Sequence, residues 1–474
     1  MSHSPPSEPD YPYPPRFRAL KRWSVIGSLV IIALVGLRIW WGRECQRRFD
    51  ALVTDAHSHG RRILINDFAF SPVPDERNAA AVLRTAANAL NKNKSKELDE
   101  WDFGGELPLN TTDVRMIQEL LRTHGDDLGQ ARGARDLKQV DWGVRLRTPA
   151  MNVLLPFLSE IRHLSSTEQA VALYQHTRGN DRETMEGVRD ILFQARALEA
   201  EPTFLVSHLV SISVQSLGSR LVLQTAPDLA VVNSSRSSNG PATRQQVLAV
   251  MGELLDESSI LRGASQGWDG ERMGMLDNIP FFARQQLQEP LWTIFRPMFL
   301  LDGVRAARDA GEATRMFDEP DYVKASRYPQ SFRTGKYPVL LLSTRVMSQF
   351  LAVGPSKTLL QRHWSLIAER RAAAIALGLR LYALDHEGRL PARLEDLVPE
   401  YMPALPADPF TEGRPFCYRP DSPAPMLYSV GINGFDDNGD GSQKPGTANP
   451  PDIVFSLAPR PRVTTAPAAA PTDQ

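Results

Sequence analysis

The feature that most constrains this chain is an apolar segment near its N-terminus. Residues 23–41 read WSVIGSLVIIALVGLRIWW, with basic residues before and after them. A helix of about 20 apolar residues spans the hydrocarbon layer of a bilayer, and tryptophans at both ends fit the interfacial belts. Arg38 lies one turn from the end, where its side chain can reach the headgroups. The segment therefore predicts a transmembrane helix that makes the lipid bilayer a partner of this protein.

A cleaved signal peptide is the alternative interpretation of this segment. Its cleavage site would need small residues, whereas the segment ends in the bulky Ile39-Trp40-Trp41. We therefore expect an uncleaved, single-pass anchor. Basic residues flank both ends, so their distribution barely decides the orientation. We expect a cytoplasmic N-terminus, because that tail is short and because the acidic loop described below suits extracytoplasmic calcium.

Composition narrows the classes of protein that remain. The 474 residues can bury a substantial core, and the length is typical of about three domains. The chain has 54 basic and 55 acidic residues, so its net charge is -1 and it has no excess positive field to attract nucleic acid. Cys45 and Cys417 are too few for a disulfide framework and lack the paired spacing of a zinc site. We expect two unpaired thiols.

Residues 44–362 carry a helical pattern almost throughout. Apolar side chains recur every three or four positions, as in residues 151–164 and 183–198. Residues 204–223 are apolar enough to be mistaken for a second membrane span. Four polar residues within that stretch favour a buried helix instead: they are His208, Gln215, Ser219 and Arg220. We expect an α-helical ectodomain over 44–362.

After Gly388 the helical pattern gives way to prolines and short strand-like runs. Residues 416–419, 426–430 and 453–457 predict three short antiparallel strands. The predicted fold class is therefore mainly α, with an N-terminal transmembrane helix, a helical ectodomain and a small C-terminal α+β module.

The remaining boundaries follow from composition. The C-terminal module is expected over residues 363–458. The two ends, 1–15 and 459–474, are rich in proline and small or polar residues, and both are expected to be disordered.

The densest chemical signal is an acidic turn that reads DDNGDG. Oxygen-bearing side chains alternate at Asp436, Asn438 and Asp440, and Gly441 permits the sharp turn that directs them at one point. Calcium takes about six to eight oxygen ligands in such loops. With Asp437, three carboxylates lie within five positions, and they repel one another unless a cation or water separates them. The spacing predicts a calcium site.

The same residues match the first half of an EF-hand loop, Asp-x-Asn-x-Asp-Gly. The twelfth position counted from Asp436 is Thr447, which cannot supply a bidentate carboxylate. Pro445 and Pro450 also prevent an exiting helix. A loop held between strands therefore fits better than a helix–loop–helix hand.

Residues 365–457 carry a series of short motifs in a fixed order. They are HEGRLP from His386, LEDLVP from Leu394, LPADPF from Leu405, then YR, LYSVG and DI. This order resembles the C-terminal part of the major pseudopilins of type II secretion systems. In that family a calcium loop follows the Tyr-Ser-x-Gly strand and is closed by an aspartate.

The resemblance implies a ligand set by position. It adds a backbone ligand and two side-chain ligands to the acidic turn, and Asn433 stands where the family usually has Asp. The full set is Val430, Asn433, Asp436, Asp437, Asn438, Asp440 and Asp452. No prepilin-like cleavage motif precedes the apolar helix, and the whole ectodomain separates that helix from the module. The chain is therefore not expected to be a fibre subunit.

The layout as a whole looks like a group of membrane-anchored bacterial proteins with a helical ectoregion before such a module. That likeness implies the bacterial inner membrane, with the bulk of the chain extracytoplasmic, and no activity. Our first functional hypothesis is a non-catalytic scaffold or binding protein with a calcium-stabilised module. A component that docks with type II secretion machinery is one alternative.

The other alternative is an extracytoplasmic serine hydrolase that uses Ser265. Residues 263–267 match the nucleophile elbow G-x-S-x-G, which needs a buried strand before it and a helix after it. The preceding residues 256–262 are polar and not strand-like. His57 and His59 could suggest a metal pair, but their spacing on a helix points the rings in different directions. We expect a solvated helix face there.

Overall fold

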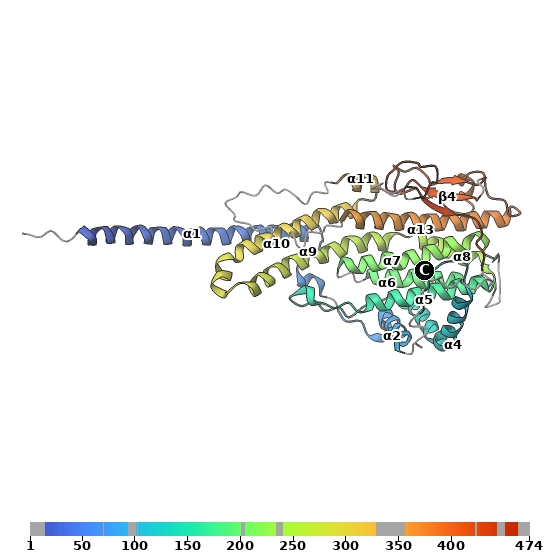
Figure 1. The fold of residues 1–474 in the computed structure, drawn as a ribbon, viewed down its shortest axis with the longest axis horizontal. Coiled ribbons are helices and arrows are strands. Elements are labelled where there is room, and N and C mark those ends of the chain that lie inside the picture. Colours follow the sequence, from blue (N-terminus) through green and yellow to red (C-terminus); the bar gives the residue numbers. More distant parts are fainter. Residues whose placement is uncertain are drawn as a thin grey trace, which may run out of the picture.

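The computed structural model describes residues 15–69, 71–92, 101, 103–200, 204–233, 240–328, 356–421, 424–442 and 451–462. Within these residues the chain is mainly helical, with one long N-terminal helix and a small antiparallel sheet near the C-terminus. The predicted fold class is therefore confirmed. A long helix projects from one end of an elongated helical body (Figure 1).

The projecting helix is α1 (Pro15–Ser58), a single element of 44 residues. Its apolar part, 23–41, is largely exposed. Among the described residues it is the one helix long and apolar enough to cross a membrane, which makes it a candidate membrane anchor. Farther along, Leu52 and Ala56 are buried against α9 and α10. The anchor and the body thus share one unbroken helix.

The body is built from helices whose consecutive members pack against each other, most extensively α9 with α10 and α6 with α7. Their bounds are α2 (Ala79–Lys92), α4 (Thr111–Gly133), α5 (Phe157–Thr177), α6 (Asp181–Ala200), α7 (Leu205–Thr225), α8 (Arg244–Leu255), α9 (Ser258–Gln286), α10 (Glu289–Asp318), α11 (Tyr322–Arg327) and α13 (Ser356–Asp385). The 3-10 turns are η1 (Ile65–Phe68), η2 (Asp75–Arg77), η3 (Ala134–Asp136), η4 (Ala150–Asn152), η5 (Ala226–Asp228) and η7 (Leu394–Leu397).

Local sequence explains where several helices begin. Asn110 accepts the Asp113 N–H at 2.8 Å, and the Asp113 carboxylate accepts the Asn110 N–H at 3.1 Å. The same reciprocal arrangement, a capping box, links Thr243 to Gln246 at the start of α8. Each cap satisfies backbone donors that have no partner inside the helix.

Helix α7 lies inside the body and is packed on several sides. Leu221 and Val222 are buried, and so are its polar residues His208 and Gln215. The expectation of a buried helix in place of a second membrane span is confirmed. Close packing extends to α5 and α6, where a methyl group placed on Gly187 would lie 2.9 Å from the Ala172 Cβ.

The C-terminal sheet has the order β3-β4-β5, formed by β3 (Cys417–Arg419), β4 (Met426–Ser429) and β5 (Ile453–Ser456). Both pairings are antiparallel, with Leu427 opposite Tyr418 on one side and Phe455 on the other. The three predicted strands are confirmed. A short parallel pair, β1 (Val231–Val232) and β2 (Ala242–Thr243), lies between α7 and α8 in the chain.

Two predicted boundaries change. The division at 362/363 falls inside α13, and one hydrophobic core contains Leu360 and Trp364 from either side of it. Residues 459–462 of the predicted tail contact the body, since Arg462 Nε donates to Asp228 Oδ2 at 2.9 Å. The rest of both predicted tails, 1–14 and 463–474, lies outside the described residues.

Arg370 of α13 ties this helix to the body. Its guanidinium donates to the carbonyls of Leu254 at 3.0 Å, Glu253 at 2.7 Å and Asp256 at 2.9 Å. These carbonyls belong to the C-terminal end of α8, where the helix itself supplies no donors. Burial lowers the pKa of Arg370 to about 10, so the side chain stays protonated at neutral pH.

Replacing Arg370 by Met should lower the free energy of unfolding by about 3 kcal/mol, since each of the three carbonyls would lose a partner worth roughly 1 kcal/mol. The measurement is thermal unfolding of the full chain in detergent. Arg389→Met is the control, because Arg389 is exposed and pairs with exposed Glu387. Equal stability of Arg370→Met and the control would contradict this account.

Candidate functional site

The residues of the predicted calcium loop lie together beyond the end of β4. Asp436 Oδ1 accepts the Tyr428 hydroxyl at 3.2 Å and the Asn438 N–H at 2.8 Å. Asn433 donates from its amide to Asp437 Oδ2 at 2.7 Å. The structure therefore brings these predicted ligands into one loop, where they bind neighbours of their own chain.

Asp452 closes the loop from the start of β5. Its carboxylate accepts the N–H of Asp437 at 3.2 Å and of Gly439 at 2.7 Å. The side chain is buried, and burial together with the nearby charges of Asp436 and Asp437 raises its pKa. These contacts are backbone N–H groups, and the ligand role that the resemblance implies for Asp452 stays a prediction.

The sharp turn of this loop lies at a different residue from the one we predicted. Asn438 and Gly439 have positive φ angles of 63° and 77°, whereas Gly441 does not. Gly441 instead lies against β5, where a methyl group on it would be 3.2 Å from Val454 Cγ2. Glycine is therefore needed at position 441 because a larger side chain would not fit against β5.

The donors of the loop suit a hard cation in their chemistry, since they are carboxylate and amide oxygens. In this arrangement, however, Asp440 Oδ1 accepts the Ser442 N–H at 2.9 Å, and the other side chains also face N–H or O–H groups. Among the described residues no group of three or more His, Cys, Asp or Glu is placed to hold a metal ion. Calcium binding would need these side chains to turn, and it stays a prediction.

Val430 and Asp408 hold the base of the loop. The Val430 N–H donates to Asp408 Oδ2 at 3.0 Å, and the Ser429 hydroxyl donates to Asp408 Oδ1 at 2.8 Å. Asp408 is buried, which raises its pKa. Asp408 was not among the predicted site residues, although it stands in the LPADPF motif.

Ser265 lies inside α9, without the strand and sharp turn of a nucleophile elbow. It is buried, and its hydroxyl accepts a hydrogen bond from the Arg61 guanidinium. A guanidinium has no free acceptor and stays protonated, so it cannot serve as the general base that a serine nucleophile needs.

The two glycines of the Ser265 motif have a packing role. A methyl group on Gly263 would lie 1.6 Å from Glu199 Oε2, and one on Gly267 would lie 3.2 Å from the Leu205 backbone. Both glycines therefore allow α9 to approach α6 and α7 closely. The match to G-x-S-x-G arises from helix packing.

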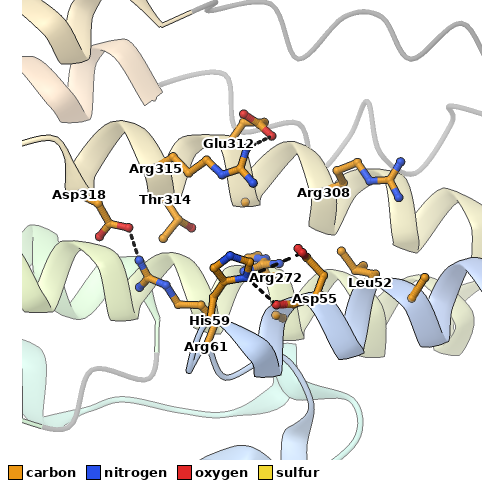
Figure 2. A pocket seen from close by; sticks show the side chains of 13 residues that line it. Leu52, Asp55, His59, Arg61, Arg272, Arg308, Glu312, Thr314, Arg315 and Asp318 are labelled. Atoms are coloured by element: carbon orange, nitrogen blue, oxygen red, sulfur yellow. Dashed lines mark hydrogen bonds and ion pairs between the residues drawn. The ribbon is translucent and has the colours of Figure 1, made fainter.

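A cavity of about 400 Å³ lies between the end of α1 and helices α9 and α10. Figure 2 shows its polar side chains, with His59 and Arg61 directed from the α1 end toward α10. Arginines predominate in its lining over the carboxylates. The charged residues are Asp55, His59, Arg61, Arg272, Arg308, Glu312, Arg315 and Asp318.

Charge pairs cross this cavity and join three elements. Arg61 binds Asp318 of α10 and lies 3.8 Å from Asp269 of α9. His59 hydrogen-bonds the Asp55 carbonyl at 2.8 Å, and His57 hydrogen-bonds Asp67 Oδ2 at 2.8 Å. The network links the candidate anchor to the α9–α10 pair (Figure 2).

Asp269 is the unusual acid of this network. It is buried between Arg61 and Arg272, and a second cavity of about 500 Å³ reaches it beside Ser265. Burial raises the pKa of Asp269 to about 6 although both arginines oppose the shift. Burial also lowers the pKa of Arg272. The carboxyl group therefore titrates near neutral pH.

A buried chain of three residues was not predicted. His208 hydrogen-bonds Glu199 Oε1 at 2.7 Å through Nδ1 and His363 Nδ1 at 3.2 Å through Nε2. Burial, and then the neighbouring His208, lower the pKa of His363 well below its usual range. The rings of Phe317 and Trp364 pack against His363. The chain thus joins α6, α7 and α13 inside the core.

Comparisons with models of protein families, with characterised proteins and with solved structures find no match to this chain.

Asp269→Asn tests the electrostatics of the cavity. Because the folded pKa of about 6 exceeds the ordinary 3.8, ionisation of this group should weaken folding as pH rises from about 4 to about 6. The free energy of unfolding of the variant should not decline over this pH range, and the two proteins should differ by on the order of 3 kcal/mol in the size of the decline. Urea unfolding of the full chain in detergent at pH 4 to 7 measures it.

Ser265→Ala is the matched control, since it removes another partner of Arg61 without removing a titrating group. Its pH dependence should match that of the unmodified chain. A decline of the same size in Asp269→Asn would refute the assignment of the pH dependence to Asp269.

Proposed function

We propose that this chain is a bacterial inner-membrane protein whose ectodomain acts outside the cytoplasm as a non-catalytic scaffold or binding protein. The observation that carries the proposal is the continuity of α1. One helix contains both the apolar segment 23–41 and the residues packed between α9 and α10. A bilayer around the apolar segment would therefore fix the direction in which the body extends.

The position of the C-terminal sheet supports a presenting role. The sheet rests on α13, and it lies at the opposite end of the body from the free part of α1 (Figure 1). Since α13 contains 30 residues, it extends for about 45 Å. The module would be held well away from the membrane surface, in reach of a partner.

Calcium binding by the acidic loop belongs to the same proposal. Asp436 and Asp437 are exposed and Asp440 is half-buried in one turn, and buried Asp452 has a raised pKa beside the first two charges. A cation would relieve that repulsion and stabilise the loop. Docking to secretion machinery is the alternative for the partner, and it rests on the resemblance of the module.

Membrane anchoring predicts the behaviour of the full chain in a Gram-negative bacterium. The intact N-terminus should be found by mass spectrometry, and the protein should stay in membranes after alkaline carbonate treatment. Changing Ile31 and Ile32 to Arg should release part of it, because each central arginine costs about 2.5–3.5 kcal/mol of insertion. The control carries Leu at both positions.

Orientation is read from reporters fused after residue 462. Alkaline phosphatase should be active there and green fluorescent protein dark. A soluble protein that begins near Trp41 would instead establish a cleaved signal peptide and refute the proposed membrane anchor.

The calcium assignment predicts a change in thermal stability. Millimolar calcium should raise the melting temperature of the full chain in detergent relative to a chelator, and Asp436→Ala with Asp440→Ala should abolish that rise. Glu395→Ala, which removes an exposed acid elsewhere in the module, should keep it. An unchanged rise in the loop variant would remove calcium from this proposal and leave the anchor intact.

A further inference from the structure

The connection between α9 and α10 forms a hairpin whose tip has an exposed apolar surface. We define the hairpin tip as residues 281–296. Leu291 and Ile294 are 45% and 49% exposed, and they lie on one side of α10 at helical spacing. Four aromatic side chains of the tip, Phe281, Phe282, Trp292 and Phe295, are half-buried.

The tip lies against the end of the apolar segment of α1. Arg38 donates to the Thr293 carbonyl, between Leu291 and Ile294. Next along both helices, a methyl group on Gly42 would lie 3.9 Å from Pro297 Cγ. Since contacts advance in the same direction along α1 and α10, the tip reaches the level of the last turns of segment 23–41.

At that level α1 also carries exposed apolar side chains. Leu37, Ile39 and Trp40 are about half exposed. Leu291 and Ile294 therefore lie at the level where α1 carries exposed apolar side chains. If α1 spans a bilayer, the lipid that surrounds Trp40 would also surround the tip.

The chemistry of the tip fits the interface between hydrocarbon and headgroups. Aromatic rings are enriched at that depth, and arginines there bind lipid phosphates. The exposed residues Arg284 and Glu289 pair at 2.9 Å, which reduces the cost of their insertion. Arg296 of the tip and Arg43 of α1 are exposed as well.

We propose that the hairpin tip inserts into the interfacial layer of the leaflet where α1 leaves the membrane. The partner is the lipid bilayer, and the tip gives the body a second membrane contact beside the anchor. This inference rests on the proposed membrane-spanning role of α1. The two contacts together would prevent the body from swinging about α1.

Nitroxide labels on the full chain in nanodiscs of phosphatidylethanolamine and phosphatidylglycerol test the insertion. In a background of Cys45→Ala and Cys417→Ser, the labels are placed by Leu291→Cys and, separately, Ile294→Cys. The matched control is Leu248→Cys in α8, where the native side chain is 44% exposed, close to Leu291. Collision with oxygen, which enters lipid, is compared with collision with a water-soluble nickel chelate.

Insertion predicts a severalfold higher oxygen-to-nickel ratio at both tip positions than at Leu248→Cys. Equal ratios at the tip and at the control would overturn the proposal. Protection from both agents, with spin–spin broadening that disappears when unlabelled protein is added, would overturn it in favour of contact between two copies.

A label at Val35→Cys in the apolar segment separates this inference from the proposed function. A lipid-like ratio at Val35 with an aqueous ratio at the tip would refute insertion and leave the anchor standing. An aqueous ratio at Val35 would refute both. Circular dichroism of each labelled variant confirms that the helices are retained.

Discussion

The packing of α1 along α10 is the interaction on which the rest of the architecture depends. Trp41 and Cys45 are buried with Leu301, and Leu52 farther along is buried with Val304. These contacts extend over several turns, and they determine the direction of α1 relative to the body. The hydrophobic effect itself has no preferred direction, but closely packed side chains fit together in only one arrangement. The cavity network then adds charge pairs at the end of the same helix. Any role of the protein at a membrane depends on this packing of α1 against α10.

Buried polar groups organise the opposite end of the molecule. Arg370 of α13 donates hydrogen bonds to carbonyls at the end of α8, and Asp408 accepts a backbone N–H just after β4. Each acts across elements distant in sequence, and leaving such a buried group without a partner is costly. The sheet therefore belongs to the same folded unit as the helices. A cation in the acidic loop would stabilise a local turn and would not be needed for the fold as a whole.

Sequence patterns predicted the local structure well and the tertiary contacts poorly. The apolar segment and the buried helix follow from local composition and length, and the three strands follow from short local patterns; all of these signals depend on near neighbours. The contact of His208 with His363 joins residues 155 apart in the chain, and no spacing signals it. The G-x-S-x-G match at residues 263–267, which lacks the preceding strand of a catalytic turn, coincides with the close approach of α9 to its neighbours at Gly263 and Gly267. The acidic turn was found, but the residue that makes it sharp was not.

The hairpin also accounts for an otherwise unfavourable feature of α9 and α10. Each has a proline in its interior, Pro280 and Pro297, and an internal proline removes a backbone hydrogen bond and bends a helix. Both lie within about three turns of the connection, so the bends occur near the same level of the hairpin. Figure 1 shows the hairpin tip turning away from α1 there. A tip that continued straight would follow α1 toward the hydrocarbon, where the polar connection would be costly. With the tip inserted as proposed, the bend would keep that connection near the headgroups, while Leu291 and Ile294 remain at the level of segment 23–41.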